Sequence, residues 1–373
     1  MAKTRCVNYD WVEVFAMESD HYPARTVSYY ESYYGSLNVV RREYGTPMYK
    51  DMITIYNGKT KLIEVRRDPL SKASEGGIFP DRCCHIRLTN RSCYLPDPIG
   101  FLLAFLHTHH LEYVSTKRID VCLDFNRFDG GDDPATFLRK YHARKYAKFY
   151  QREFFDHGRD QWQDAYYNSV KWGSPTSVIT TKLYNKTEEL ARPKCGKPYI
   201  VDAWRACGLD VNQPVWRVEF SIRPDFKNLV KETTGETMPV DIMQFRTRGQ
   251  LLNLFFMLAD RYFKFCYVEK RPDGKLQRKD RCRRKMLFRI DAEQCGYKPY
   301  DEPTTAAAPD KVLFKMLDKL MELADETKTG QQLDHIYFTA KMIIEEYAVS
   351  DFYKEWLTHR LTALISTKYD TKL

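Results

Sequence analysis

Short segments rich in β-branched residues recur through the first 235 residues of the chain. Most of them alternate apolar and polar side chains, and Gly, Asn, Pro or Asp residues bound them, which is the pattern of strands that pack one face on a core. A mixed fold of strands and helices is therefore expected, with helices at 99–113 and from Asp133-Pro134 to about residue 153. The expected strands are 11–17, 51–57, 61–67, 85–90, 118–125, 177–185 and 215–222.

The second half of the chain has a different pattern. Helical spacing of apolar residues is expected at 240–267, 311–325 and 331–346, with polar or basic stretches between these segments. The change predicts three parts: a catalytic domain over 1–235, a helical and basic segment over 236–305, and a helical subdomain over 306–373.

The chain of 373 residues is long enough for two or three domains, and its 43% hydrophobic and 14% aromatic content is typical of a folded protein. No segment approaches the roughly 20 apolar residues of a membrane-spanning helix. The 10 cysteines include no pair of C-x-x-C motifs. Reduced thiols in a cytoplasmic protein are expected.

Most of the formal net charge of +9 is concentrated in one segment. Between Lys264 and Arg289 there are eleven Lys or Arg residues and three acids. A cluster of this kind suits a polyanion such as DNA, although a solvated hairpin tip would give the same pattern. The candidate DNA-binding residues are Lys279, Arg281, Arg283, Arg284 and Lys285.

Carboxylates alternate with apolar residues in the segment Arg118–Phe125. In a strand, Asp120, Cys122 and Asp124 share one face, and the two carboxylates lie about 7 Å apart. Such a pair favours a divalent cation or basic partners, and a solvated sheet face is the equal alternative.

Two later segments repeat this arrangement. In 215–222, Arg217 and Glu219 share a face, so that Glu219 can join the first two acids across a sheet, or Arg217 can form an ordinary salt bridge with an acid. In 177–185, Lys182 and Tyr184 share a face, and Lys186 follows. Lysines beside a tyrosine stabilise its phenolate and attract a phosphodiester.

The order of these segments resembles the replication initiation factor family, which includes rolling-circle initiators of plasmids and the relaxases of some conjugative elements. The elements that carry the resemblance are RIDVCLDF, a G-S-x-x-S turn, a strand ending in Y-N-K, an acid five residues after that tyrosine, and W-R-V-E. The resemblance covers roughly 83–222, and HIRLTNRSCY also resembles the strand and turn before the family's first acidic strand.

The resemblance implies an α+β fold related to the HUH nucleases, with a central antiparallel sheet, flanking helices and a mostly helical C-terminal part. Tyr184 is then the nucleophile, and Lys186 and Glu189 complete the Y-N-K-x-x-E pattern. The implied metal ligands are Asp120, Asp124 and Glu219, with Lys182 and Arg217 in support.

The expected reaction is metal-assisted attack of Tyr184 on a DNA phosphate, which leaves a 5′-phosphotyrosine and a free 3′-OH. Oxygen ligands favour Mg²⁺ or Mn²⁺. The expected partners are a single-stranded nick site and origin duplex, and the helical second half offers surface for a helicase.

Three alternatives stay open. The first is a site of HUH type built from His107 to His110 with Tyr146 or Tyr150, but FLLAFLHTHH has helical spacing and Thr108 separates the histidines. The second is a non-enzymatic DNA-binding protein, and the third is a nuclease that uses water. A conjugative relaxase would use the same chemistry as an initiator.

Overall fold

A large antiparallel sheet organises the computed structural model. Ten strands follow the order β2-β3-β4-β5-β1-β6-β11-β10-β9-β8, and every neighbouring pair is antiparallel. The expected α+β fold with an antiparallel sheet is confirmed for the described part of the chain. The structure describes residues 4–42, 45–130, 132–149, 153–158, 166–174, 177–193, 195–223, 229–231, 237–238, 240–288 and 297–299.

The strands of the large sheet are β1 (Cys6–Glu18), β2 (Val39–Arg41), β3 (Tyr49–Asn57), β4 (Thr60–Pro69), β5 (Cys83–Leu88), β6 (Leu111–Phe125), β8 (Glu153–Gly158), β9 (Tyr166–Trp172), β10 (Ile179–Asn185) and β11 (Trp216–Ile222). Two three-stranded sheets contain β7 (Tyr146–Lys148), β14 (Phe265–Tyr267) and β15 (Arg284–Lys285), and β12 (Leu229–Lys231), β13 (Thr237–Met238) and β16 (Tyr297–Pro299). The helices are α1 (Val27–Tyr34), α2 (Pro98–Thr108), α3 (Pro134–His142), α4 (Lys186–Ala191), α5 (Pro198–Ala206) and α6 (Arg248–Tyr262).

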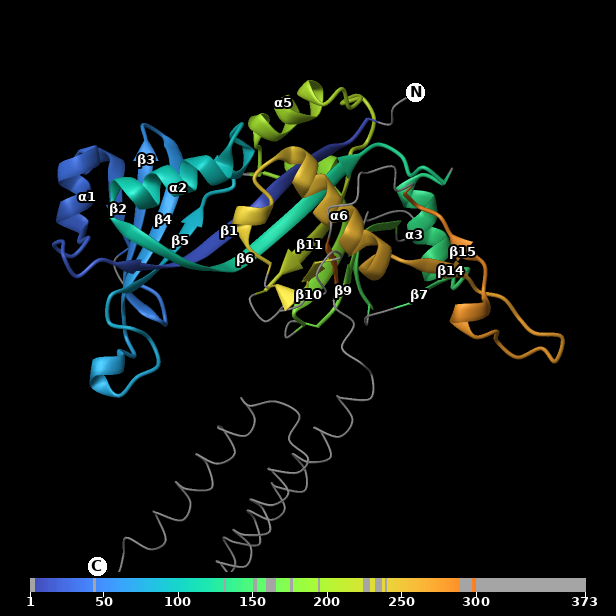
Figure 1. Ribbon diagram of the computed structural model, residues 1–373. Coiled ribbons are helices and arrows are strands. Elements are labelled where there is room, and N and C mark those ends of the chain that lie inside the picture. The colour runs from blue at the N-terminus through green and yellow to red at the C-terminus, as the bar shows by residue number, and fades with distance from the viewer. Residues whose placement is uncertain are drawn as a thin grey trace, which may run out of the picture. The chain divides into compact units, whose positions relative to one another are not determined.

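The long strands β1 and β6 lie in the middle of the sheet and join its two halves (Figure 1). Apolar residues of both strands, such as Val12 and Val121, share one core with residues of α2 and α6, so these helices cover one sheet face. The other face carries the polar alternates. At one end α5 packs on that polar face, where Ile200 and Trp204 contact Cys6 and Val215.

Three expected boundaries are corrected by the structure. The helix at 99–113 ends at Thr108, because the chain turns at His110, whose φ is 51°, and enters β6. The helix from Asp133 ends at His142 rather than near residue 153, because the chain enters β7, which pairs with β14. The helix expected at 240–267 is limited to α6.

The expected domain boundary near residue 235 does not separate two compact units. Leu254 and Phe255 of α6 belong to the same core as the large sheet, and one compact unit runs from Met1 to Pro299. The segments at 311–325 and 331–346, and the whole of 306–373, lie outside the described residues.

Candidate active site

A polar pocket opens on the sheet face opposite α2 and α6. Its volume is about 390 Å³, and side chains of β1, β6, β10 and β11 line it. The antiparallel register explains why they meet, because Lys182 lies opposite Glu219 and Tyr184 lies opposite Arg217. Six of the residues predicted from the sequence line this pocket: Asp120, Lys182, Tyr184, Lys186, Glu189 and Glu219.

Two charged side chains contact the hydroxyl of Tyr184. Its hydroxyl donates a hydrogen bond to Glu219 Oε2 at 2.9 Å, and Lys186 Nζ lies 3.5 Å from the same hydroxyl. Burial and the charge of Glu219 raise the pKa of Tyr184 well above its usual value. The resting hydroxyl is therefore a phenol, and its proton already points at a carboxylate.

The junction between β10 and α4 places Lys186. The Asn185 side chain accepts a hydrogen bond from the Glu188 backbone N–H, so it ends the strand and caps the helix. One turn of helix then brings Glu189 Oε1 to 2.8 Å from Lys186 Nζ, whose side chain is only 2% exposed. The pattern Y-N-K-x-x-E is thus a strand end and helix start that fix one buried lysine beside the tyrosine.

The two remaining pocket residues of the predicted set form ion pairs. Lys182 Nζ lies 2.8 Å from Glu219 Oε1. Arg118 donates two hydrogen bonds to Asp120, at 2.8 and 2.6 Å. Burial, with the charges of Glu219 and Asp10, still raises the pKa of Asp120 to about 6 against the pull of Arg118. The pocket interior therefore disfavours the charged form of Asp120 even with Arg118 bound to it.

Asp124 lies outside the pocket, so the structure does not support its predicted role as a metal ligand. Its carboxylate accepts hydrogen bonds from Arg217 Nε and Nη2 at 2.6 and 2.7 Å and from Trp204 Nε1 at 2.6 Å. Asp124 and Arg217 are both fully buried. The salt-bridge interpretation of Arg217 is confirmed, and the reason is the register that sets Arg217 opposite Asp124.

Asp10 is a pocket residue that the sequence did not reveal. It lies at a bulge of β1, between the paired residues Tyr9 and Trp11, and Arg217 Nη1 donates to its Oδ1 at 2.6 Å. Burial would raise its pKa, but the charges of Arg217 and Lys186 outweigh this and lower it to about 2. A single aspartate in an apolar strand carries no motif, and the bulge that turns it into the pocket is a tertiary feature.

The carboxylates of Asp10, Asp120 and Glu219 suit a hard cation such as Mg²⁺, because all of their donor atoms are oxygens. Among the described residues, however, no group of three or more His, Cys, Asp or Glu side chains is placed to hold a metal ion. Asp120 and Glu219 are instead paired with Arg118 and Lys182, whose side chains are 36% and 37% exposed. Both side chains are long and partly open to solvent.

The alternative site of HUH type is not assembled. His109 is fully buried, and Tyr29 and Tyr34 hydroxyls hydrogen-bond its two ring nitrogens at 3.0 and 2.7 Å. Burial lowers its pKa to about 4. Tyr146 is buried on β7 and donates to Asp132 at 2.8 Å, and α2 and β7 lie on opposite sides of the molecule (Figure 1). Tyr150 lies outside the described residues.

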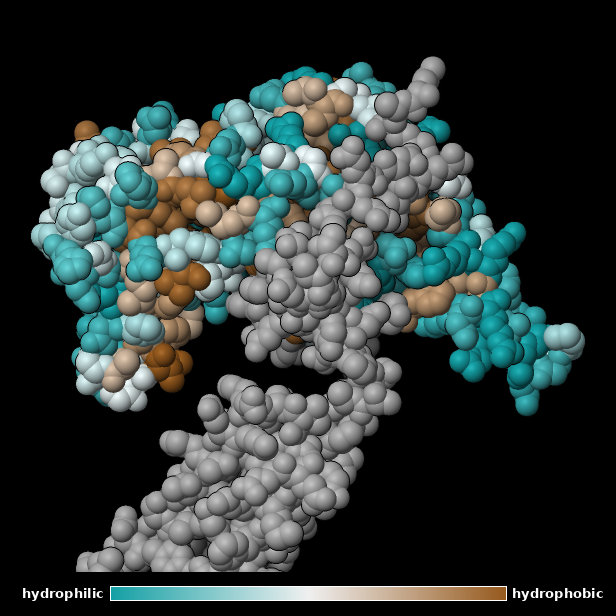
Figure 2. Space-filling model, in the orientation of Figure 1, coloured by the Kyte–Doolittle hydropathy of each residue, from teal (hydrophilic) through white to brown (hydrophobic). Residues whose placement is uncertain are grey.

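The predicted basic segment forms an arm, residues 268–283, whose stem is continuous with β14 and β15. Figure 2 shows the arm as a strongly hydrophilic projection at the right of the molecule. Of the predicted DNA-binding residues, Arg281, Arg283 and Arg284 are exposed. Lys285 is 7% exposed and pairs with Asp132 at 3.0 Å, while Lys279 Nζ donates to the Lys148 carbonyl at 2.6 Å. These two lysines hold the base of the arm.

No helix among the described residues has the length and apolar character needed to cross a membrane. No protein-family model matches the chain, and no curated protein matches its sequence. Among solved structures, the chain is similar to a rolling-circle replication initiator protein from Geobacillus stearothermophilus, at 14% identity and a TM-score of 0.45. The similarity covers 76% of this chain and 93% of that chain.

Proposed function

We propose that this protein is a DNA strand-nicking endonuclease that initiates rolling-circle replication, with Tyr184 as its nucleophile. The observation that carries the proposal is the Tyr184 hydroxyl, which donates to Glu219 at 2.9 Å with Lys186 at 3.5 Å, in a pocket on an exposed sheet face. A nucleophile, a proton acceptor and a buried cation in one pocket are the parts that transesterification at a phosphodiester requires.

In the proposed reaction Glu219 removes the proton of Tyr184 as the phenolic oxygen attacks phosphorus. The bond from phosphorus to the tyrosine oxygen forms, the bond to the 3′ oxygen breaks, and the leaving oxygen takes a proton from solvent. Because the pKa of Tyr184 is raised, its attack depends on this acceptor. Lys186 offsets the charge that develops on the phenolic oxygen.

We propose a divalent cation, Mg²⁺ or Mn²⁺, as the cofactor. Asp120 and Asp10, with Glu219 beside them, are the pocket carboxylates that would hold it. When bound, the ion would polarise a phosphate oxygen. The placement of three carboxylates in one solvent-open pocket supports a cation here.

The proposed partner is DNA: a single strand at the pocket and duplex at the arm, where exposed arginines fit the phosphate backbone. A conjugative relaxase would use the same residues in the same way, and a helicase is a further proposed partner of the initiator.

The test is incubation of the full chain with single-stranded oligonucleotides from its own gene's neighbourhood, labelled at the 3′ end, with Mn²⁺ or EDTA. We expect a covalent adduct on a denaturing gel that requires Mn²⁺ and is lost in Tyr184→Phe. Tyr146→Phe is the matched control, because that tyrosine is buried outside the pocket.

Other outcomes point elsewhere. An adduct that survives Tyr184→Phe but not Tyr146→Phe would move the nucleophile. Cleavage without an adduct would indicate a nuclease that uses water, and binding without cleavage would indicate a DNA-binding protein.

A further inference from the structure

A second pocket lies at the end of the sheet, where β6 and β10 end and β11 begins. Its volume is about 530 Å³, which is within the roughly 300–1,000 Å³ usual for small-molecule sites. The N-terminal turn of α3 forms one wall and the loop before β11 another. None of the residues predicted from the sequence as catalytic or metal-binding lines this pocket.

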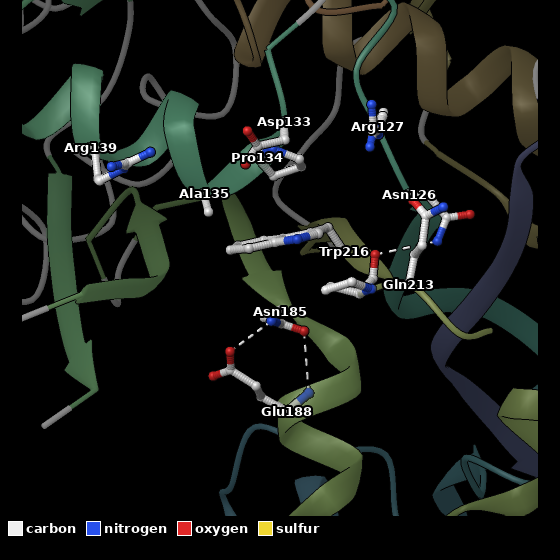
Figure 3. A pocket seen from close by; sticks show the side chains of 11 residues that line it. Asn126, Arg127, Asp133, Pro134, Ala135, Arg139, Asn185, Glu188, Gln213 and Trp216 are labelled. Atoms are coloured by element: carbon white, nitrogen blue, oxygen red, sulfur yellow. Dashed lines mark hydrogen bonds between the residues drawn. The ribbon is translucent and has the colours of Figure 1, made fainter. Parts of the chain in front are cut away.

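An indole ring lies at the centre of this pocket. Figure 3 shows Trp216 nearly edge-on, between Pro134 and Ala135 on one side and Asn185 with Glu188 on the other. Trp216 is only 5% exposed and belongs to the core, so the packing around it fixes the orientation of its ring. The indole therefore gives the pocket a rigid floor, of which a small part is exposed, beside an apolar wall.

Polar groups stand at the rim. Arg127, Arg139 and Gln213 are exposed and line the pocket. Arg139 Nη2 donates to Thr136 Oγ1 at 3.0 Å, and within the described part of the chain neither arginine forms an ion pair with a carboxylate. Both guanidinium groups are thus available to an anionic ligand.

Asn185 joins this pocket to the candidate active site, because it lines both. It follows Tyr184 directly in β10, and its side chain is anchored: Nδ2 donates to Glu188 Oε1 at 2.7 Å. Because successive residues of a strand point to opposite faces, the two pockets open on either side of this strand end, and a single strand that passes the end can reach both.

We propose that the second pocket binds one nucleobase of the cut strand, adjacent to the scissile phosphate; this inference rests on the proposed nicking function. The base stacks in the aromatic and apolar part of the pocket, as bases of single strands do on protein aromatic rings. Arg127 and Arg139 contact the flanking phosphates. The pocket thereby holds the strand in register with Tyr184 and selects the base next to the nick.

The test uses the full chain and the oligonucleotide that forms the adduct, in versions with one abasic site at each position flanking the nick. The variant Ala135→Phe fills the pocket from an exposed position, and Ala206→Phe on α5 is the matched control. We expect one abasic position to slow adduct formation by the wild type about tenfold, a factor within the contribution of one stacked base. Ala135→Phe should show a similar loss on the intact strand and no further loss on the abasic one.

Equal abasic effects in the wild type and in Ala135→Phe would overturn the proposal. If no oligonucleotide forms an adduct, the proposed function fails, and the same series is then compared by equilibrium binding. Binding that is sensitive to one abasic site in the wild type but not in Ala135→Phe would still support a base pocket, and binding that is equal in both would overturn it.

Discussion

Arg217 is the residue on which the geometry of the polar pocket depends. It is fully buried and donates to Asp124, Asp10 and the Tyr94 hydroxyl. Its position opposite Tyr184 in the register means that it also supports the strand that carries Tyr184. A buried guanidinium with two carboxylate partners holds the strands β1, β6 and β11 together, because the loss of either partner would leave a buried charge unpaired.

We expect Arg217→Met to lower the free energy of unfolding by about 3–5 kcal/mol, because it leaves the Asp124 charge buried and unpaired. Urea denaturation measures the change. The matched control is Arg205→Met, which breaks a pair with Asp202 whose side chains are 61% and 68% exposed. That pair contributes less than about 1 kcal/mol. Equal losses in the two variants would contradict the role assigned to Arg217.

Asp120 makes stability depend on pH. Because its folded-state pKa, about 6, lies above the ordinary value of 3.8, folding favours the protonated form. The stability contribution of this proton is present below a pH of about 4 and is lost as the pH rises to about 6. Without metal, Asp120→Asn should therefore gain about 1–3 kcal/mol relative to the wild type across this range.

Urea denaturation in EDTA at several pH values measures this gain. Asp202→Asn is the control for the loss of an exposed carboxylate. A difference between Asp120→Asn and wild type that is constant from pH 4 to 7 would contradict a raised pKa.

At the scale of elements, the sequence predicted seven of the ten strands of the large sheet and which of their side chains share a face, but it missed β2, β8 and β9. Alternation in Arg118–Phe125 and in Trp216–Ile222 is a local property, and the structure confirms both strands. Register is not local: the contact of Arg217 with Asp124 joins residues 93 positions apart, and that of Trp204 with Asp124 joins residues 80 apart. This is why the sequence could not separate Asp124, bound in the interior, from Asp120 in the pocket.

The sequence could not reveal the bulge in β1 either, because a bulge also depends on how strands pair. It places Asp10 in the pocket, but it exists only because two strands pair with unequal spacing. The end of α3 was also mispredicted, since Arg144 adopts a positive φ of 57° and the chain leaves the helix for a strand partner far along the sequence.

The basic arm should contribute affinity for duplex DNA rather than chemistry. We expect Arg281→Gln with Arg283→Gln to weaken binding to all unrelated duplexes by a similar factor. The log–log slope of the binding constant against salt concentration should fall by up to about 2. Binding titrations over a range of salt concentrations measure the slope, and adduct formation on a single strand should stay close to wild type. A matched control is Arg205→Gln with Arg42→Gln, which removes equal charge from exposed positions away from the arm. An unchanged slope in the arm variant would exclude the arm from the interface.

At the scale of the described molecule, one face of the large sheet packs on the core, and the other face carries the pocket of charged side chains. Helices α2 and α6 bury one face, so that the other face can expose a continuous set of charged side chains without loss of the core. The two pockets lie near one end of this sheet, at the residues where β10 gives way to α4. One strand end therefore positions both Tyr184 and a wall of the second pocket.

The arm is also the part of the described chain most open to replacement. The hydrogen bonds that close its tip, from Arg271 N to the Lys275 carbonyl and from Gln277 N to the Glu269 carbonyl, lie within the arm. Its stem joins the rest through short pairings of β14 with β7 and β15. Insertions, deletions or a grafted sequence in 269–278 should thus leave the large sheet intact, which makes this segment a natural place for related chains to diverge in length and for engineered changes of target preference.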